Sequence, residues 1–259
     1  MSEKLARSAG LISIATMASR ILGVGREMVL AAFFGAGSGF EMDAYNVAFR
    51  VPNLLRDLFA EGAMTAAFVP TFTRTLTDRG PDAAWRLGNL VINALLIVTA
   101  VIVVLGVLFA YPITHAIAPN FARTPGELEL TTMLTRLMLP FLPTVAVSVA
   151  MMGMLISLRR FFIPALSRAM FNVATIACAF ALVPLMARIG LPAIAAIAIG
   201  TLVGGLGQMA LQSPALRREG FRYRPIVDFK DPDLREVLRL MGPGTLGLAA
   251  VQINVFVNT

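Results

Sequence analysis

The sequence predicts an all-α protein: a polytopic membrane helix bundle with seven spans and a cytoplasmic N-terminus. Composition is the first observation behind this prediction. Of the 259 residues, 57% are hydrophobic and only 14% are charged, whereas soluble domains carry about 25% charged residues. A chain this apolar needs a lipid bilayer as its solvent. Cys178 is the only cysteine, so an intrachain disulfide and a cysteine-based metal centre are excluded.

Long uncharged runs are the second observation. A helix rises 1.5 Å per residue, so about 20 apolar residues cross about 30 Å of hydrocarbon. Five runs without Lys, Arg, Asp or Glu are long enough: Leu87–Ile113, Leu137–Leu158, Ala169–Ala187, Ile189–Leu216 and Leu240–Thr259. Two upstream runs, Ala9–Gly37 and Asp43–Phe72, are also mostly apolar but contain charged residues. We predict that they are two further spans.

The distribution of basic residues is the third observation, and it sets the orientation. With the N-terminus in the cytoplasm, 14 of the 22 Lys and Arg residues fall in cytoplasmic segments and 2 in outside segments. This asymmetry explains the net charge of +7 through orientation and contact with membrane lipids, without nucleic acid. We divide the chain into an N-terminal six-helix lobe (1–213), a cytoplasmic amphipathic connection (214–238) and a seventh span (239–259).

The first two spans carry polar residues at helical spacing. Charged side chains inside a membrane usually face a bundle interior or a water-filled cavity. In the second span, steps of three and four residues place one polar set on one helix face: Asp43, Asn46, Arg50, Asn53, Asp57 and Glu61. The first span has a similar set: Ser13, Thr16, Arg20, Gly23 and Glu27. We expect these two stripes to face each other and share one polar interior.

Arg26 and Arg56 lie off these stripes, each six residues from a stripe arginine. Gly23 and Gly25 in the first span and Pro52 in the second favour bends near the charges. Guanidinium groups facing a cavity suit an anionic ligand, phosphate above all, because their planar fork donates two parallel hydrogen bonds. The alternative is a structural network in which the acids neutralise the arginines and no ligand binds.

At these residues the chain resembles the MurJ (MviN) lipid II flippase family, within the multidrug, oligosaccharidyl-lipid and polysaccharide exporter superfamily. The resemblance lies in six stretches: residues 19–23, 26–27, 34–37, 43–50, 52–63 and 67–70. It continues at Pro119, Arg160-Phe161, Ile163-Pro164-Ala165, Asn172 and Met241-Gly242-Pro243, and so covers nearly the whole chain.

The resemblance implies a two-lobe transporter of fourteen helices in the bacterial cytoplasmic (inner) membrane, with a role in peptidoglycan and cell wall biogenesis. Its substrate would be lipid II, a polyprenyl-diphosphate-linked peptidoglycan precursor, moved by alternating access. Substrate-binding residues would be Arg20, Arg26, Arg50, Arg56, Asp43 and Asn53, with Glu27, Asp57 and Glu61 as a supporting charge network. The family commonly has a second basic residue where this chain has Asp57.

The chain ends inside what would be the seventh helix, so it lacks the second lobe. We therefore expect it to be transport-incompetent alone, unless it dimerises or meets a separate C-terminal half.

Three other functions stay open. A flippase for another lipid-linked glycan or a drug exporter would share the architecture, and acidic dominance in the cavity would favour the drug exporter. A non-transporting membrane scaffold would need a dry, fully paired charge cluster. An enzyme has little support, because His115 is the only histidine and neither a catalytic motif nor a metal or cofactor motif is present.

Two smaller patterns also allow more than one interpretation. One pattern is the spacing of four and three residues between Arg168, Asn172 and Thr175. These side chains either extend the polar interior from the fifth span or do not reach that interior. Gly200 and Gly204, four residues apart, allow close helix approach, either within the chain or between two copies.

Overall fold

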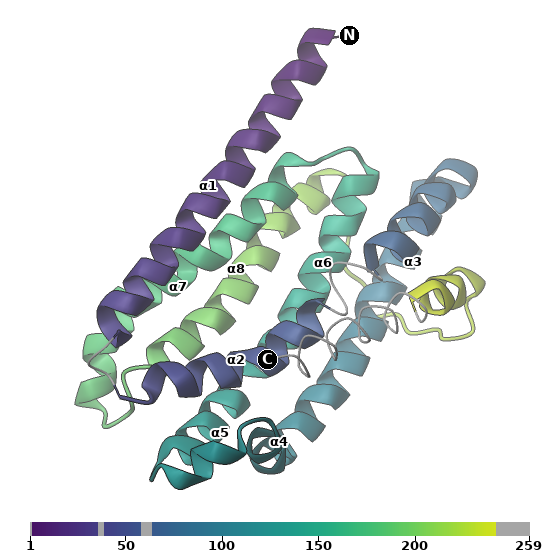
Figure 1. Ribbon diagram of the computed structural model, residues 1–259. Helices are drawn as coiled ribbons and strands as arrows, with labels where there is room; N and C mark the ends of the chain where they lie inside the picture. Colours follow the sequence, from purple (N-terminus) through teal and green to yellow (C-terminus); the bar gives the residue numbers. More distant parts are fainter. Residues whose placement is uncertain (1, 36–38, 58–63, 242–259) are drawn as a thin grey trace.

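The computed structural model describes residues 2–35, 39–57 and 64–241, and this part of the chain is helical, without β-strands. The helices are α1 (Ser2–Phe34), α2 (Glu41–Asp57), α3 (Met64–Leu108), α4 (Ala110–Ile117), η2 (Pro119–Arg123), α5 (Glu127–Met138), α6 (Phe141–Ser157), α7 (Phe162–Arg188) and α8 (Ala195–Arg218) (Figure 1). A last helix covers residues 232–241. The predicted seventh span lies outside the described residues from residue 242 onward.

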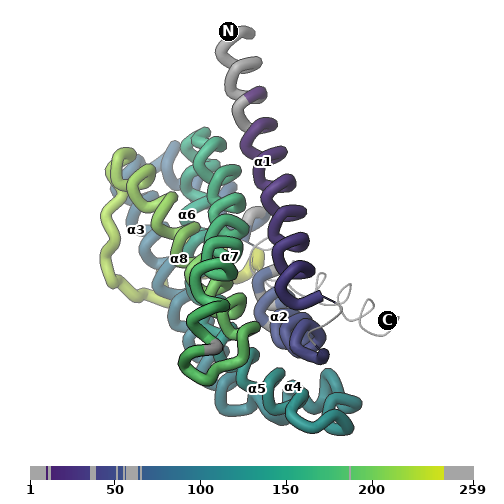
Figure 2. Tube along the Cα trace, turned by 90° about the vertical axis from the view of Figure 1, so that its left-hand side faces the viewer, coloured from purple at the N-terminus to yellow at the C-terminus, as the bar shows by residue number. Residues whose placement is uncertain are grey.

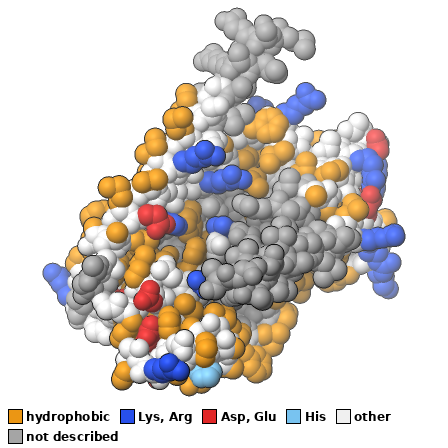
Figure 3. Space-filling view, viewed as in Figure 1, with side chains coloured by type: hydrophobic (Ala, Val, Ile, Leu, Met, Phe, Trp, Pro, Cys, Tyr) orange, Lys and Arg blue, Asp and Glu red, His pale blue; other side chains and the backbone are white. Residues whose placement is uncertain are grey.

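Four helical segments among the described residues are long and apolar enough to cross a membrane: Ala66–Leu108, Glu127–Ser157, Phe162–Met186 and Ala195–Arg218. The helix α1, with 33 residues, is longer than each of the last three segments, and it exposes an apolar stripe. Ile14, Met17, Ile21, Val24 and Met28 are each more than 60% exposed, and Figure 3 shows hydrophobic side chains along the outer edge of this helix. Such a stripe suits contact with lipid.

The helix α3 is a hairpin. Its backbone breaks at Gly80, which has φ 81° and is followed by Pro81. The ring centroids of Phe72 and Trp85 lie 5.7 Å apart, although 13 residues of straight helix would separate them by about 20 Å. Residues 64–79 therefore form one arm and residues 81–108 the other. Glycine allows the positive φ that this reversal requires.

The bundle packs α1 along α7, α7 on α8, α6 on α3 and α8, and α2 on α5. Figure 2 shows α1 beside α7, with α3 on the opposite side of the molecule. The main hydrophobic core joins both arms of α3 to α6, and a second core joins the end of α1 to α2 and α5. Between α1, α2, α6 and α7 lies a cavity, which is described below with the polar side chains that line it.

Glycines let α8 approach its neighbours closely. A Cβ atom on Gly200 would lie 3.0 Å from the Cβ atom of Cys178, and one on Gly204 would lie 2.7 Å from the ring of Phe171. Both neighbours belong to α7, so the two glycines serve packing within the chain.

The connection after α8 is bound to the second arm of α3. The side chain of Asn89 donates to the carbonyl of Arg222 (3.1 Å) and accepts from the amide of Arg224 (2.8 Å). The side chain of Asn93 donates to the carbonyls of Arg224 and Ile226, both at 2.9 Å, and accepts from Tyr223 at 2.7 Å. The two side-chain amides thus provide hydrogen-bond partners for backbone groups of an extended segment that is not paired with a β-strand.

Ion pairs hold the last helix to the same hairpin. Arg74 donates to Glu236 (Nη1 to Oε1, 3.0 Å) and Arg79 pairs with Asp233. The hydrogen bond from Arg74 lowers the pKa of the Glu236 carboxyl, so this carboxyl stays ionised at neutral pH. Asp231 begins the helix, since its carboxylate accepts from the amides of Asp233 and Leu234 at 3.0 and 3.2 Å.

Replacing both Asn89 and Asn93 with alanine is expected to release the connection. Each substitution leaves backbone groups without partners, at about 1–3 kcal/mol, so trypsin should cleave after Arg222 at least about tenfold faster. Timed proteolysis followed by mass spectrometry measures this rate. Asn120→Ala, on the exposed η2 turn, is the control. An unchanged cleavage rate in the double variant would show that the amides do not hold the segment.

Candidate functional site

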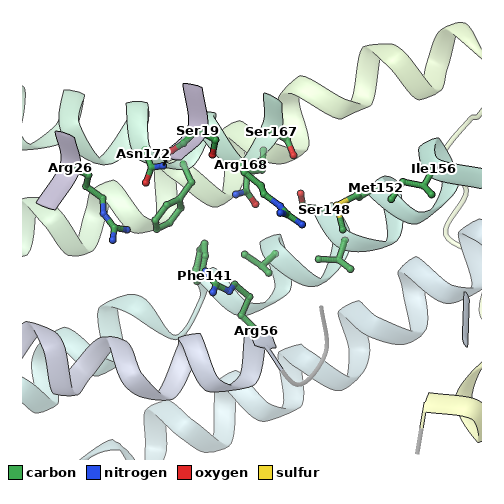
Figure 4. Close-up of a pocket in the computed structure, with 14 residues that line it drawn as sticks. Ser19, Arg26, Arg56, Phe141, Ser148, Met152, Ile156, Ser167, Arg168 and Asn172 are labelled. Atoms are coloured by element: carbon green, nitrogen blue, oxygen red, sulfur yellow. Dashed lines mark hydrogen bonds between the residues drawn. The ribbon is translucent and has the colours of Figure 1, made fainter. Parts of the chain in front are cut away.

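A cavity of about 640 Å³ lies between α1, α2, α6 and α7. Three arginines from three different helices line it: Arg26 of α1, Arg56 of α2 and Arg168 of α7. In the close-up, Arg56 lies across the cavity from Arg26 and Arg168 (Figure 4). The remaining lining residues are Ser19, Phe141, Val145, Ser148, Val149, Met152, Ile156, Ser167, Phe171, Asn172 and Gln208.

The contact between α1 and α7 places Arg26 at the cavity. Asn172 of α7 donates from Nδ2 to the backbone carbonyl of Ser19 at 3.2 Å. Gly23 lies opposite the same amide, because a Cβ atom there would be 3.7 Å from it. With the two helices fixed at this point, Arg26 extends over Phe171 of α7.

The Arg26 guanidinium is partly stabilised within the protein. Its Cζ atom lies 5.6 Å from the centroid of the Phe171 ring, within range of a cation–π interaction, and it pairs with the neighbouring Glu27 carboxylate. The side chain is 20% exposed, and its buried Nε–H has no hydrogen-bond partner in the part of the chain that the structure describes. A buried donor of this kind is costly to leave unpaired, and it lies at the cavity wall.

A second cavity, of about 430 Å³, adjoins the first. Arg20 lines it, and Ser19, Met152, Ile156 and Arg168 line both cavities. Together the two cavities are lined by four arginines, and none of their described lining residues is Asp or Glu. The site is therefore suited to an anion.

The predicted site residues divide between these cavities and their surroundings. Arg26 and Arg56 line the first cavity and Arg20 the second, whereas Asp43, Arg50 and Asn53 line neither. Asp43 lies in the first turn of α2 and is exposed, where an acid is favourable to the helix dipole. The side chain of Asp57 and the whole of Glu61 lie outside what the structure describes.

The expectation that the two polar stripes face each other needs correction. Thr16 and Arg20 of the α1 stripe line the second cavity, whereas the described residues of the α2 stripe line neither cavity. Arg26 and Arg56, which lie off the stripes, are the two that share the first cavity. Which face of a helix lines the cavity depends on the helices that pack around it. The spacing of polar residues within one helix does not show which face that is.

Several lining residues gave little or no signal in the sequence. Ser148 is one of three hydroxyl residues in the apolar helix α6. Gln212 of α8 donates from Nε2 to its Oγ atom at 2.6 Å. Arg168 and Asn172 had the helical spacing that suggested a polar interior, and both line the cavity. Thr175 does not, because it is buried and donates to the carbonyl of Phe171.

The described residues include no group of three or more His, Cys, Asp or Glu side chains that could hold a metal ion. Long apolar helices around an arginine-lined cavity define the class of this protein: a polytopic membrane protein. A family model described as "Lipid II flippase MurJ" matches residues 30–259. The chain belongs to the MurJ family of lipid II flippases, which are transporters and not enzymes, as the motifs at Arg26 and Arg56 predicted.

Curated relatives agree with this assignment. The chain is 32% identical over 248 residues to the probable lipid II flippase MurJ of Buchnera aphidicola subsp. Schizaphis graminum, covering 96% of this chain and 47% of that protein. It is 33% identical over 258 residues to the probable lipid II flippase MurJ of Bdellovibrio bacteriovorus, covering 99% of this chain and 48% of that protein. The chain thus spans about half the length of the curated relatives it matches.

Solved structures show the same relationship. A structure of "Lipid II flippase MurJ, inward closed conformation" superposes with a TM-score of 0.70 at 26% identity, over 95% of this chain and 49% of that one. An outward-facing multidrug resistance MATE family transporter of the MOP superfamily superposes with a TM-score of 0.65 at 16% identity, over 95% of this chain and 53% of that one. At this lower identity the likeness concerns the fold alone.

Proposed function

We propose that the protein moves lipid II across the bacterial cytoplasmic membrane, and that its cavity arginines receive the diphosphate of this lipid. The observation that carries the proposal is the pair of adjoining cavities with four arginines and no acid among their described lining residues. Family membership supports the choice of substrate. A cationic drug would require acidic lining, and a scaffold would require a dry and fully paired cluster, so both alternatives are less favourable.

Each phosphate of a diphosphate can accept a bidentate pair of hydrogen bonds from one guanidinium. Arg26 and Arg56 approach the first cavity from opposite sides (Figure 4), so a diphosphate between them would contact both. This contact lowers the free-energy cost of bringing charged phosphates to the membrane interior. Moving one charge across the membrane is worth about 2.3 kcal/mol per 100 mV, so the membrane potential biases this step. Arg20 would act in the second cavity. Asp43, Arg50, Asn53, Glu27, Asp57 and Glu61 remain predicted supports.

We also propose seven spans with a cytoplasmic N-terminus, divided at residues 213 and 238. The ion pairs between segments support this topology. Arg160, between α6 and α7, donates from Nε to Glu219 at 2.8 Å, and Arg74 and Arg79 pair with acids of the last helix. These contacts join three segments that the distribution of basic residues assigns to the cytoplasm. Such ion pairs can form only between segments on the same side of the membrane, so they agree with the assignment. In this topology, α2 and the first arm of α3 belong to the second span.

Alternating access requires two bodies that move against each other around a central site. Since the chain aligns with about half of each relative, we propose that these residues form one lobe and that a second lobe completes the transporter. The polyprenyl tail would stay in the surrounding lipid while the headgroup crosses through the cavity.

A flipping assay tests the proposed function. A version of the protein that carries both lobes is reconstituted in vesicles with fluorescent lipid II, and the fraction of lipid accessible from outside is followed by quenching. We expect this fraction to change with time in the presence of the protein and to stay constant in protein-free vesicles. Identical traces in both kinds of vesicle would refute the proposal.

Residues 1–259 alone are expected to bind the substrate without flipping it, because one lobe cannot rock against itself. The same vesicles, prepared with this polypeptide at equal protein density, should give the protein-free trace. Vesicles with both lobes supplied as separate polypeptides are the positive control. Robust flipping by monomers of residues 1–259 would show that one lobe is sufficient.

A further inference from the structure

Arg168 lies where the two cavities meet. Four residues line both cavities, and Arg168 is the one charged residue among them. The junction between Arg20 in the second cavity and Arg26 and Arg56 in the first therefore includes the Arg168 side chain.

The backbone of α7 holds Arg168 in this place. Its neighbours Ser167 and Ala169 are 3% and 4% exposed, and the Ser167 hydroxyl donates to the carbonyl of Pro164 at 2.8 Å. One turn further on, Asn172 donates to the backbone of Ser19 and fixes α7 against α1. Rotation of α7 would break the bond from Asn172 to Ser19 and would bring the buried Ser167 and Ala169 to the surface. In the present orientation Arg168 is exposed to the cavity.

The positive charge of Arg168 is not neutralised by contact. It has no ion pair or hydrogen bond within the described part of the chain, whereas Arg26 pairs with Glu27 and Arg160 pairs with Glu219. A cation held at a cavity wall without a carboxylate partner favours a mobile anion as its partner.

We propose that Arg168 is a further phosphate-binding residue, which holds the diphosphate at the junction and transfers it between the Arg20 cavity and the cavity of Arg26 and Arg56. This inference rests on the proposed function. With Arg168 shared, each cavity offers at least two guanidinium groups, enough for one on each phosphate. The substrate would thus keep a charged partner throughout its movement between cavities, and would not be released into an apolar environment.

Binding to a version of the protein that carries both lobes tests this proposal. The probes are a polyprenyl diphosphate, the matching polyprenyl monophosphate and free inorganic pyrophosphate. Removing one charged hydrogen-bonding group should weaken diphosphate binding about tenfold to hundredfold, so Arg168→Gln should show that loss and Arg168→Lys a smaller one. Arg188→Gln is the matched control, because Arg188 lies exposed in the last turn of the same helix and lines neither cavity.

Charge restoration separates a phosphate contact from a packing effect. Arg168→Cys in a version without Cys178 is labelled with a cationic or an anionic methanethiosulfonate. The cationic label should restore diphosphate binding and the anionic label should not, and bound polyprenyl diphosphate should slow the labelling. This variant also decides the matter if Arg168→Gln does not fold.

The outcomes are distinguishable. If the unmodified protein binds no polyprenyl diphosphate, both the proposed function and this inference fail. A second outcome is that the unmodified protein binds the diphosphate and Arg26→Ala weakens this binding. If Arg168→Gln and the anionic label on Arg168→Cys then leave the affinity unchanged, only the role of Arg168 is overturned. Equal losses for polyprenyl diphosphate and pyrophosphate would support recognition of the phosphates themselves, and a loss confined to the lipid would assign Arg168 to the lipid-borne diphosphate.

Discussion

Growth of cells depleted of their own flippase should not be rescued by a version of the protein with both lobes in which Arg26 and Arg56 are replaced by alanine. These two residues line the first cavity from α1 and α2. Each charged contact to phosphate is worth about 1.5–3 kcal/mol, so loss of both should weaken diphosphate binding by a factor of about 100 or more. Colony formation after depletion, at matched protein level, measures the effect.

Arg123→Ala provides the control for this experiment. Arg123 is exposed on the η2 turn and lines neither arginine cavity, so its substitution should leave rescue intact. Single substitutions of Arg26 and Arg56 should each reduce rescue at limiting expression. Full rescue by the double variant would mean that the cavity arginines are structural, and would remove the main support for substrate binding there.

The largest effect on stability is expected at Gly205. A Cβ atom on Gly205 would lie 2.2 Å from the Thr144 hydroxyl oxygen and 2.9 Å from the Phe141 ring, and both belong to α6. Gly205→Leu must therefore separate α8 from α6, with an expected loss of about 3 kcal/mol in the free energy of unfolding, as for severe overpacking. The midpoint of unfolding by sodium dodecyl sulfate in mixed micelles reports this loss.

Gly25→Leu is the matched comparison, because a Cβ atom on Gly25 would meet no atom within 4 Å. Leucine has a higher helix propensity than glycine, so this variant should unfold at the same or a higher denaturant level. A similar loss in both variants would indicate that leucine itself, and not the contact between α6 and α8, causes the destabilisation.

The membrane character and most helices were predictable from local features. Uncharged runs such as Ala169–Ala187 fall within α7, because a charge-free stretch of this length has few alternatives to a membrane helix. The hairpin of α3 was only half predictable. Gly80 and Pro81 indicate a break, but the contact between Phe72 and Trp85 that defines the reversal is tertiary.

The candidate site divides in the same way. The arginines and their motifs were visible, but the sequence placed Arg50 and Asn53 with the polar face that should line the interior. In the structure Arg26, Arg56 and Arg168 share the cavity. Ser148 and Gln208 could not be found, because a few uncharged polar residues in an apolar helix do not indicate which side faces a cavity.

The sequence by itself determined that this chain is an apolar helical bundle of the MurJ family with arginines inside its membrane helices, because composition, run length and short motifs are properties of neighbouring residues. Only the tertiary structure decided which arginines meet, since the face that lines a cavity depends on which helices pack around it. For the same reason, only the packing of α7 between α1 and α8 brought Arg168 to the junction of the two cavities.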